Sequence, residues 1–254
     1  VDAQGGVAVW EADIYLPERP MKRSGVTLLG AVLADLPRYG PDGGIYDPGL
    51  GIPYSFMSSK LTVRWLLDTP VPAAWIRAPG RMQNTFGNES FVDEIAPATG
   101  ADPFDFRTHH LSDPRGLELL ARLRTFADWQ PRGSRARDTA DVAQGRGVSY
   151  AKYELVRTYV GVVADVEVNR KTGVIQVRRV FVVHDCGQII NPDGLRNQIE
   201  GNVVQTVSRT LIEQLSFSRS AVTSLNWGSY PILTFPDVPE VAIDLIDPPG
   251  RVPW

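Results

Sequence analysis

The sequence has 254 residues, of which 43% are hydrophobic and 22% charged, and its formal net charge is -3 at pH 7. These values are typical of an ordinary soluble protein with a sizeable core, and they exclude a disordered tail. Because no basic stripe is present to neutralise phosphates, nucleic acid is not an expected partner. The single cysteine excludes an internal disulfide and any multi-cysteine zinc or iron–sulfur site within the chain. No apolar run approaches the roughly 20 residues that a membrane span needs.

In the first half of the chain, Gly- and Pro-rich stretches separate short apolar patterns. Asp102 and Asp113 each precede a proline, which is the pattern of an N-cap followed by the first helical residue, so helices are expected to begin at both. The other expected elements are strands over 7–16 and 61–67, short helices over 27–36 and 88–96, and a long loop over 37–53.

The second half contains the stronger strand patterns. Apolar runs predict strands over 159–168 and 174–183, joined by a hairpin turn in which Gly173 takes a positive φ. Residues 230–248 predict an edge strand, a turn and a second strand.

These patterns predict an α+β fold with short mixed sheets and helices packed on them. Residues 130–147, rich in Gly, Arg, Asp and Ala, are interpreted as a linker. The linker would separate a first domain over 1–129 from a second domain over 148–254.

The stretch that organises the chain is HDCGQIINPDGLRNQIEGNVVQ, residues 184–205. A strand leads into a polar turn, and Asn191 and Pro192 are placed as the N-cap and first residue of a helix. Apolar residues recur at every fourth position of the helix and predict its core face: Leu195, Ile199, Val203, Val207, Leu211 and Leu215. A second face carries polar or small residues: Gln198, Gly201, Gln205 and Ser208. Two carboxamides beside a glycine suit a flat, polar ligand edge, although the same pattern is typical of a solvated helix face.

For the other reactive residue types, a structural interpretation stands beside each functional one. Arg77 and Arg81 flank a helix-breaking Ala-Pro-Gly turn and would together hold an anion, or they are ordinary surface arginines. Cys186 is a candidate nucleophile, but a structural thiol is the favoured interpretation because no partner base is identifiable. The three histidines do not have the spacing of a metal site, and we assign no metal-ligating side chain.

Four segments, taken in order, resemble the molybdenum-binding large subunit of the xanthine dehydrogenase and aldehyde oxidase family. They are IRAPGRMQNTFGNESFVDEIA, GADPFDFRTHHLSDPR, HDCGQIINPDGLRNQIEGNVVQ and SYPILTFPDVPEV. The spacing between them is most similar to the large subunits of isoquinoline 1-oxidoreductase and nicotinate dehydrogenase. The resemblance implies that residues 1–129 and 148–254 are parts of two successive molybdopterin-binding domains.

The resemblance also implies roles for individual residues. Arg77 would contact the pterin, Ile76 would line the space near the metal, and Trp75 and Tyr54 would be further wall candidates. Gln198 would hydrogen-bond the pterin, Gly201 would allow its close approach, and Asn191 is a further cofactor-binding candidate.

The implied cofactor is a molybdenum-molybdopterin in its cytosine dinucleotide form, and the implied partners are a small iron–sulfur subunit and a cytochrome. The implied reaction is hydroxylation of an N-heteroaromatic compound or an aldehyde, with water as the oxygen source.

The sequence departs from the family pattern at both ends, and at the first the glycine-rich segments that complete the family's cofactor pocket would precede Val1. The glutamate that serves as catalytic base in the family would follow Trp254, so no catalytic residue is assigned within the chain. We expect the chain to be a fragment that is inactive by itself. The alternative is a non-catalytic cofactor-binding or assembly module derived from the family.

Overall fold

The computed structural model describes the greater part of the chain. The described residues are 2, 6–17, 33–34, 51–66, 77–78, 81–130, 141–153 and 157–247. The chain divides into two compact units, Val1–Asn88 and Glu89–Trp254, and each is described by itself. No helix within the described ranges has both the length and the apolar character needed to cross a membrane.

The first unit contains a two-stranded parallel sheet. Strand β1, Trp10–Pro17, pairs with β2, Ser59–Leu66, close to the two strands that the sequence predicted. An aromatic cluster lies at the start of the sheet, where the ring of Trp10 stacks on Phe56 with centroids 5.1 Å apart. Apart from residues 33–34, the predicted helix over 27–36 lies outside the described residues, and so do residues 37–50 of the predicted loop.

Helices α2, α3 and α4 follow in sequence. Helix α2, Arg81–Ala98, begins seven residues before the predicted start, directly after the break at Ala78, and it continues through Pro97. Helices α3, Pro103–His109, and α4, Pro114–Phe126, begin where the sequence predicted. Both predicted N-caps are confirmed, because Asp102 accepts the N–H of Phe104 and Asp113 accepts the N–H of Arg115.

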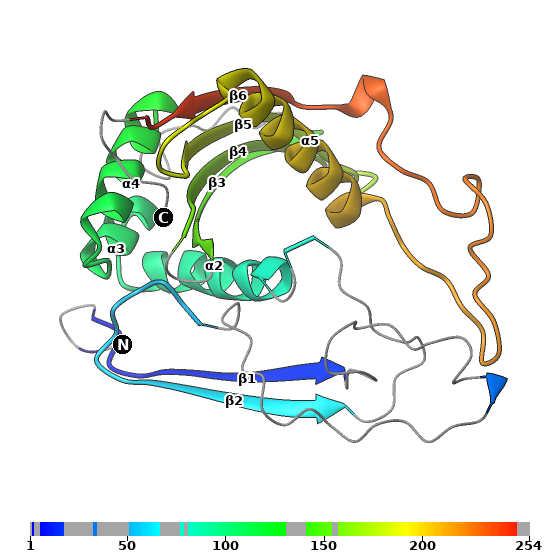
Figure 1. Cartoon of the computed structure of the whole chain (residues 1–254), viewed down its shortest axis with the longest axis horizontal. Coiled ribbons are helices and arrows are strands. Elements are labelled where there is room, and N and C mark those ends of the chain that lie inside the picture. The colour runs from blue at the N-terminus through cyan, green and yellow to red at the C-terminus, as the bar shows by residue number, and fades with distance from the viewer. Residues whose placement is uncertain are drawn as a thin grey trace. The chain divides into compact units, whose positions relative to one another are not determined.

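A four-stranded mixed sheet forms the centre of the second unit (Figure 1). Its strands are β3 (Val142–Lys152), β4 (Tyr159–Asn169), β5 (Ile175–Asp185) and β6 (Glu240–Leu245), in that spatial order. The first three are antiparallel neighbours, and β6 is parallel to β5. The hairpin between β4 and β5 turns at Gly173, whose φ of 73° confirms the prediction. The α+β fold with a mixed sheet and packed helices is therefore confirmed.

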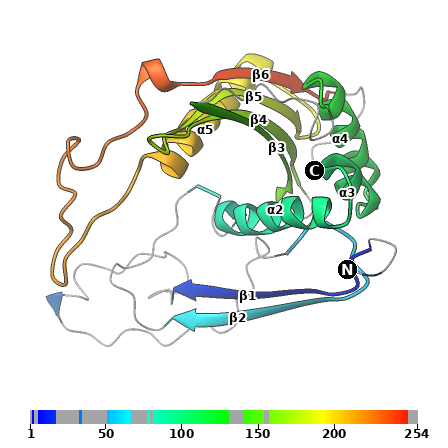
Figure 2. The same cartoon turned by 180° about the vertical axis from the view of Figure 1, so that it is seen from behind.

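Helices cover both faces of this sheet. Helix α5, Pro192–Leu211, lies along one face, as both views of the chain show (Figure 1, Figure 2). Helix α4 packs on the other face, where Leu119 and Leu123 approach the backbone of Gly161. Because successive residues of a strand point to opposite faces, Val160 and Val162 pack toward α5 while Gly161 and Val163 face α4.

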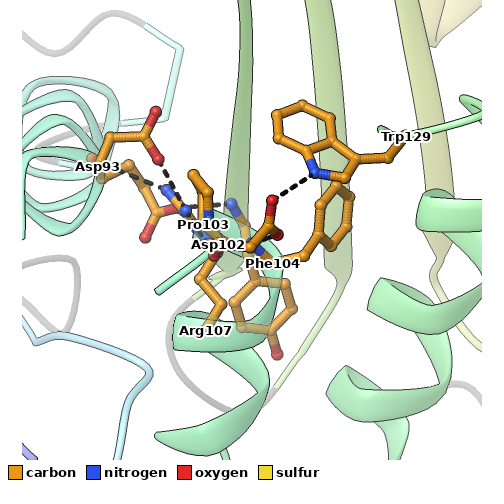
Figure 3. A network of polar contacts seen from close by, with 8 residues as sticks. Asp93, Asp102, Pro103, Phe104, Arg107 and Trp129 are labelled. Carbon is orange, nitrogen blue, oxygen red and sulfur yellow. Dashed lines mark hydrogen bonds and ion pairs between the residues drawn. The ribbon is translucent and has the colours of Figure 1, made fainter. Parts of the chain in front are cut away.

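A buried arginine joins α2 to α3 (Figure 3). The fully buried Arg107 donates to Glu89 Oε2 at 2.9 Å and to Asp93 Oδ1 at 2.8 Å, and Glu89 also accepts the N–H of Tyr150 in β3. Beside it, the indole N–H of Trp129 donates to Asp102 at 3.0 Å. These bonds satisfy charges that the packing of α2 and α3 removes from water, and they tie the edge strand β3 to α2.

Two predicted segments differ from the structure. Residues 142–147 of the predicted linker are the first half of β3, because pairing with β4 and the bond from Arg146 to Asp165 override the loop preference of Gly145 and Gly147. Residues 131–140 of that linker lie outside the described residues, and the boundary between the two compact units falls within α2. The assignment of 1–129 and 148–254 to two cofactor-binding domains stays a prediction.

The strand expected near residue 230 is absent from the described residues 230–234, and the short helix η3, Phe235–Asp237, follows. Prolines at 231, 236 and 239 remove the N–H donors that a ladder needs, so only β6 joins the sheet.

Candidate functional site

The apolar face of α5 packs against the sheet as predicted, with Ile199 buried and Leu195 and Val203 partly buried. Ile199 packs with Val180 and Val182 of β5, and Leu195 and Val203 extend the contact one turn in each direction. The guanidinium of Arg196 donates to the carbonyl of Ile243 in β6 at 2.9 Å. These contacts fix both the position of α5 and its rotation about its own axis. The helix ends at Leu211, so Leu215 lies beyond it and is exposed.

The polar face of α5 points away from the sheet. Gln198, Gly201 and Gln205 are all exposed or partly exposed, and they occupy neighbouring turns of one helix face. Among the residues that the structure describes, no side chain or sequence-distant backbone atom lies within 4 Å of where a Cβ at Gly201 would stand. Ser208, predicted for the same face, is buried instead, and its hydroxyl accepts the N–H of Leu233 at 3.0 Å. The open row therefore consists of two carboxamides with a glycine between them.

The start of α5 is set by side chains that bond the backbone. Asn191 is the N-cap, with its Oδ1 accepting the N–H of Gly194 at 2.9 Å. Before it, Asp185 Oδ1 accepts the N–H of Gly187 at 2.9 Å, and Gly187 has a φ of 77°. Sequence reasoning identified the cap but not the role of Asp185. An Asp two residues before a Gly is nevertheless a recognisable turn signal.

The predicted site residues of the first unit are described in part. Arg77 is exposed, and the next residue, Ala78, has a φ of 52°, which confirms a break in the chain before α2. Arg81 is buried and donates to the carbonyl of Gly51 at 3.0 Å, so it does not join Arg77 in an exposed anion site. Tyr54 is buried, and Trp75 and Ile76 lie outside the described residues.

Two titratable side chains lie close to the turn before α5. Burial raises the pKa of the Cys186 thiol, and the neighbouring Asp185 carboxylate raises it further. A thiol with a raised pKa is a poor nucleophile, which favours the structural interpretation of this cysteine. Burial lowers the pKa of His184, so its imidazole is neutral at pH 7.

A network of charged groups that sequence reasoning did not find ties the start of α4 to three strands. The carboxylate of Asp113 accepts bonds from Lys152 of β3 and from the hydroxyl of Tyr159 of β4, the latter at 2.8 Å. Arg115 binds the carboxylate of Asp185 of β5 through two nitrogens, at 2.7 and 3.1 Å. The partners lie 39 to 70 positions apart, and no local pattern marks such pairs.

The sequence of the chain matches known proteins. The family model of the molybdopterin cofactor-binding domain matches residues 120–239, which include most of the sheet and all of α5. A nicotinate dehydrogenase subunit of Pseudomonas putida is 38% identical over 97% of this chain and 21% of its own length. An isoquinoline 1-oxidoreductase subunit of Brevundimonas diminuta is 31% identical over 70% of this chain and 22% of its own length. The chain thus spans about a fifth of these relatives.

The fold matches as well. The aldehyde oxidoreductase of Desulfovibrio gigas superposes with a TM-score of 0.69 over 95% of this chain and 42% of its own, at 12% sequence identity. At that identity the likeness concerns the fold alone. The matched domain, the relatives and the fold agree with one another. The chain belongs to the molybdopterin cofactor-binding large subunits of the xanthine dehydrogenase and aldehyde oxidase family.

Proposed function

We propose that the complete protein is a molybdenum-dependent hydroxylase and that the polar face of α5 holds one edge of its pterin cofactor. The observation that carries the proposal is the orientation of α5. Its apolar face packs on β5 and β6, while Gln198, Gly201 and Gln205 form an open row. The space around Gly201 admits a flat ring close to the helix backbone.

The side chains present fit the edge of a pterin. A pterin ring edge alternates hydrogen-bond donors and acceptors, and a glutamine carboxamide offers both in one plane. Gln198 would bind the ring edge and orient it, and the missing side chain at Gly201 would let the ring approach. The assignments of Ile76, Arg77 and Asn191 to the same cofactor rest on the family resemblance alone. In the structure the side chain of Asn191 caps α5.

The cofactor would supply the oxygen-transfer chemistry, with water as the source of oxygen. The contribution of this chain is to bind and orient it. Two relatives are named for nicotinate and isoquinoline, which supports an N-heteroaromatic substrate; an aldehyde is the second candidate. The cytosine dinucleotide form of the cofactor, the iron–sulfur subunit and the cytochrome are proposed from the resemblance. A non-catalytic cofactor-binding or assembly role is the alternative.

The test measures the pterin content of the complete purified subunit. Pterin released by oxidation is quantified by fluorescence for the natural protein and for Gln198→Leu. The matched control is Gln214→Leu, an exposed glutamine just beyond the end of α5. We expect the pterin content of Gln198→Leu to be at least about tenfold lower than that of the natural protein, because the variant loses one hydrogen bond to a buried ligand. The control should retain the natural content.

Two outcomes decide against parts of the proposal. If Gln198→Leu keeps the pterin content of the natural protein, the polar face of α5 is not the pterin contact. If the natural protein holds pterin but hydroxylates neither N-heteroaromatic compounds nor aldehydes, the non-catalytic alternative replaces the enzyme.

A further inference from the structure

Two carboxylates bond the turn between β5 and α5, residues 186–190: the buried Asp185 accepts the N–H of Gly187, and Asp247 accepts the N–H of Ile189 at 3.3 Å. Asp185 is the last residue of β5, and its side chain is 0% exposed. Its Oδ1 accepts the N–H of Gly187, and the left-handed conformation of Gly187 turns the chain toward the helix. The carboxylate of Asp185 therefore holds the first part of the path by which the strand leads into α5.

Arg115 supplies the matching charge from the first turn of α4. Its Nη2 donates to Asp185 Oδ1 at 2.7 Å and its Nε donates to Oδ2 at 3.1 Å, so the two planar groups meet at two points. The guanidinium also lies 4.4 Å from the ring centroid of Tyr159. The hydrogen bonds to Asp185 raise the pKa of Arg115. Since a buried carboxylate without a cation is costly, Arg115 allows Asp185 to stay charged inside the turn.

The position of the turn affects the polar face of α5 directly. Gln198 follows the N-cap Asn191 by seven residues, which is about two helical turns or roughly 10 Å along the axis. Core packing sets the rotation of α5 in the folded state, so opening of the turn would act by loosening the first turns of the helix, which carry Gln198. The entry turn therefore helps to keep Gln198 in its place beside Gly201.

We propose that Asp185 and Arg115 are positioning residues for the cofactor: by locking the turn at residues 186–190 they hold the polar face of α5 in its binding orientation. This inference rests on the proposed function of that face. Neither residue touches the cofactor in this proposal, because the carboxylate of Asp185 is fully buried and Arg115 is bonded to it from the side of α4.

Cys186 makes the turn measurable without any cofactor. It is the only cysteine of the sequence, it lies within the turn, and it is half-buried. The rate at which a thiol reagent labels Cys186 under native conditions therefore reports how often the turn opens. A rate that hardly changes with added urea indicates local opening, whereas a steep dependence indicates global unfolding.

The experiment combines labelling with pterin content in the complete subunit. Asp185→Ala removes the acceptor of Gly187, and Asp244→Ala is the matched control, because Asp244 pairs an arginine of α4, Arg122, with a different strand. We expect Asp185→Ala to speed labelling by about tenfold or more with little urea dependence, since charge-assisted hydrogen bonds are lost. Its pterin content should fall by a similar factor, and the control should change both by less than about twofold.

A double variant keeps the test decisive if Asp185→Ala fails to fold. Arg115→Met/Asp185→Leu leaves no unpaired buried charge, so folding should recover, whereas labelling should stay fast and pterin low. If labelling and pterin both return to the natural values, the pair only stabilises the fold and the inference is wrong.

The failures of the two proposals are distinguishable. If the Asp185 variants keep their pterin while Gln198→Leu loses it, the positioning role is overturned and the proposed function stands. If the natural protein carries no pterin, both are overturned, whatever the labelling rates show.

Discussion

Helices α4 and α5 cover opposite faces of one sheet, yet they use their polar residues differently. In α4, Arg115 and Arg122 bind carboxylates of β5 and β6, and Leu119, Leu120 and Leu123 are fully buried. In α5 only Ile199 and Ser208 are buried, and the row at Gln198, Gly201 and Gln205 is open. The difference separates polar groups that hold the fold from polar groups available to a ligand.

The neighbouring helix α3 resembles α4 in this respect, because its Arg107 is fully buried between two carboxylates. Substitutions around α3 and α4 should therefore reduce stability. Substitutions on the polar face of α5 should leave stability almost unchanged and affect only cofactor binding.

Arg107→Met should destabilise the fold by about 3–5 kcal/mol, because it leaves the carboxylates of Glu89 and Asp93 without their buried cation. The free energy of unfolding is measured by urea denaturation at pH 7. The control is Arg124→Met, which breaks the exposed pair with Asp105 and should cost less than about 1 kcal/mol. If both variants lose the same free energy of unfolding, burial does not increase the contribution of the Arg107 ion pairs to stability.

Gly161→Ala should destabilise by about 1–3 kcal/mol through overpacking between β4 and α4. The added Cβ would stand 2.7 Å from Leu119 Cδ2 and 2.8 Å from Leu123 Cδ2, and both leucines are fully buried. The shift of the urea midpoint measures the effect. An unchanged midpoint would mean that α4 can move away from the sheet without cost.

Acidification should weaken the start of α4 through Asp113. Burial raises the pKa of Asp113, but the bonds from Lys152 and Tyr159 outweigh it, so its pKa lies below the ordinary value of 3.8. The ionised group therefore stabilises the fold above about pH 4, and that stability is lost as the pH falls through the lowered pKa.

We expect Asp113→Asn to cost about 1 kcal/mol at pH 7 and to reduce the difference in stability between pH 7 and pH 3. Urea midpoints at both pH values measure this. Asp105→Asn serves as the comparison because Asp105 is exposed. If both substitutions change the pH dependence equally, the lowered pKa of Asp113 is not its source.

Gly201→Ala should leave stability unchanged or raise it by up to about 1 kcal/mol, because alanine favours a helix and the added Cβ meets no described atom. Thermal unfolding of the ligand-free protein measures this smallest effect. In the complete subunit the same change should reduce pterin content, since the methyl group occupies the space of the ring. Destabilisation comparable to that of Gly161→Ala would mean that the face of α5 at Gly201 is packed rather than open.

Local signals in the sequence were sufficient for the elements around the site. The caps at Asp102, Asp113 and Asn191 and the turn at Gly173 depend on atoms a few residues apart, and all four were predicted correctly. The linker and the last strand were predicted less well. Glycines at 145 and 147 suggested a loop, but the pairing of β3 with β4 overrides that local preference.

Periodicity alone was enough to place Leu195, Ile199 and Val203 on one face of α5 and Gln198 and Gly201 on another, because the apolar residues recur at every fourth position. Which arginines and carboxylates meet depends instead on how the helices pack on the sheet. Arg115 and Asp185 are 70 positions apart in the sequence, and Glu89 accepts the N–H of Tyr150, which lies 61 positions away. Such pairs form where the packing of helices on a sheet buries charged residues that are distant in the sequence next to one another. The spacing of residues along the sequence does not predict this geometry.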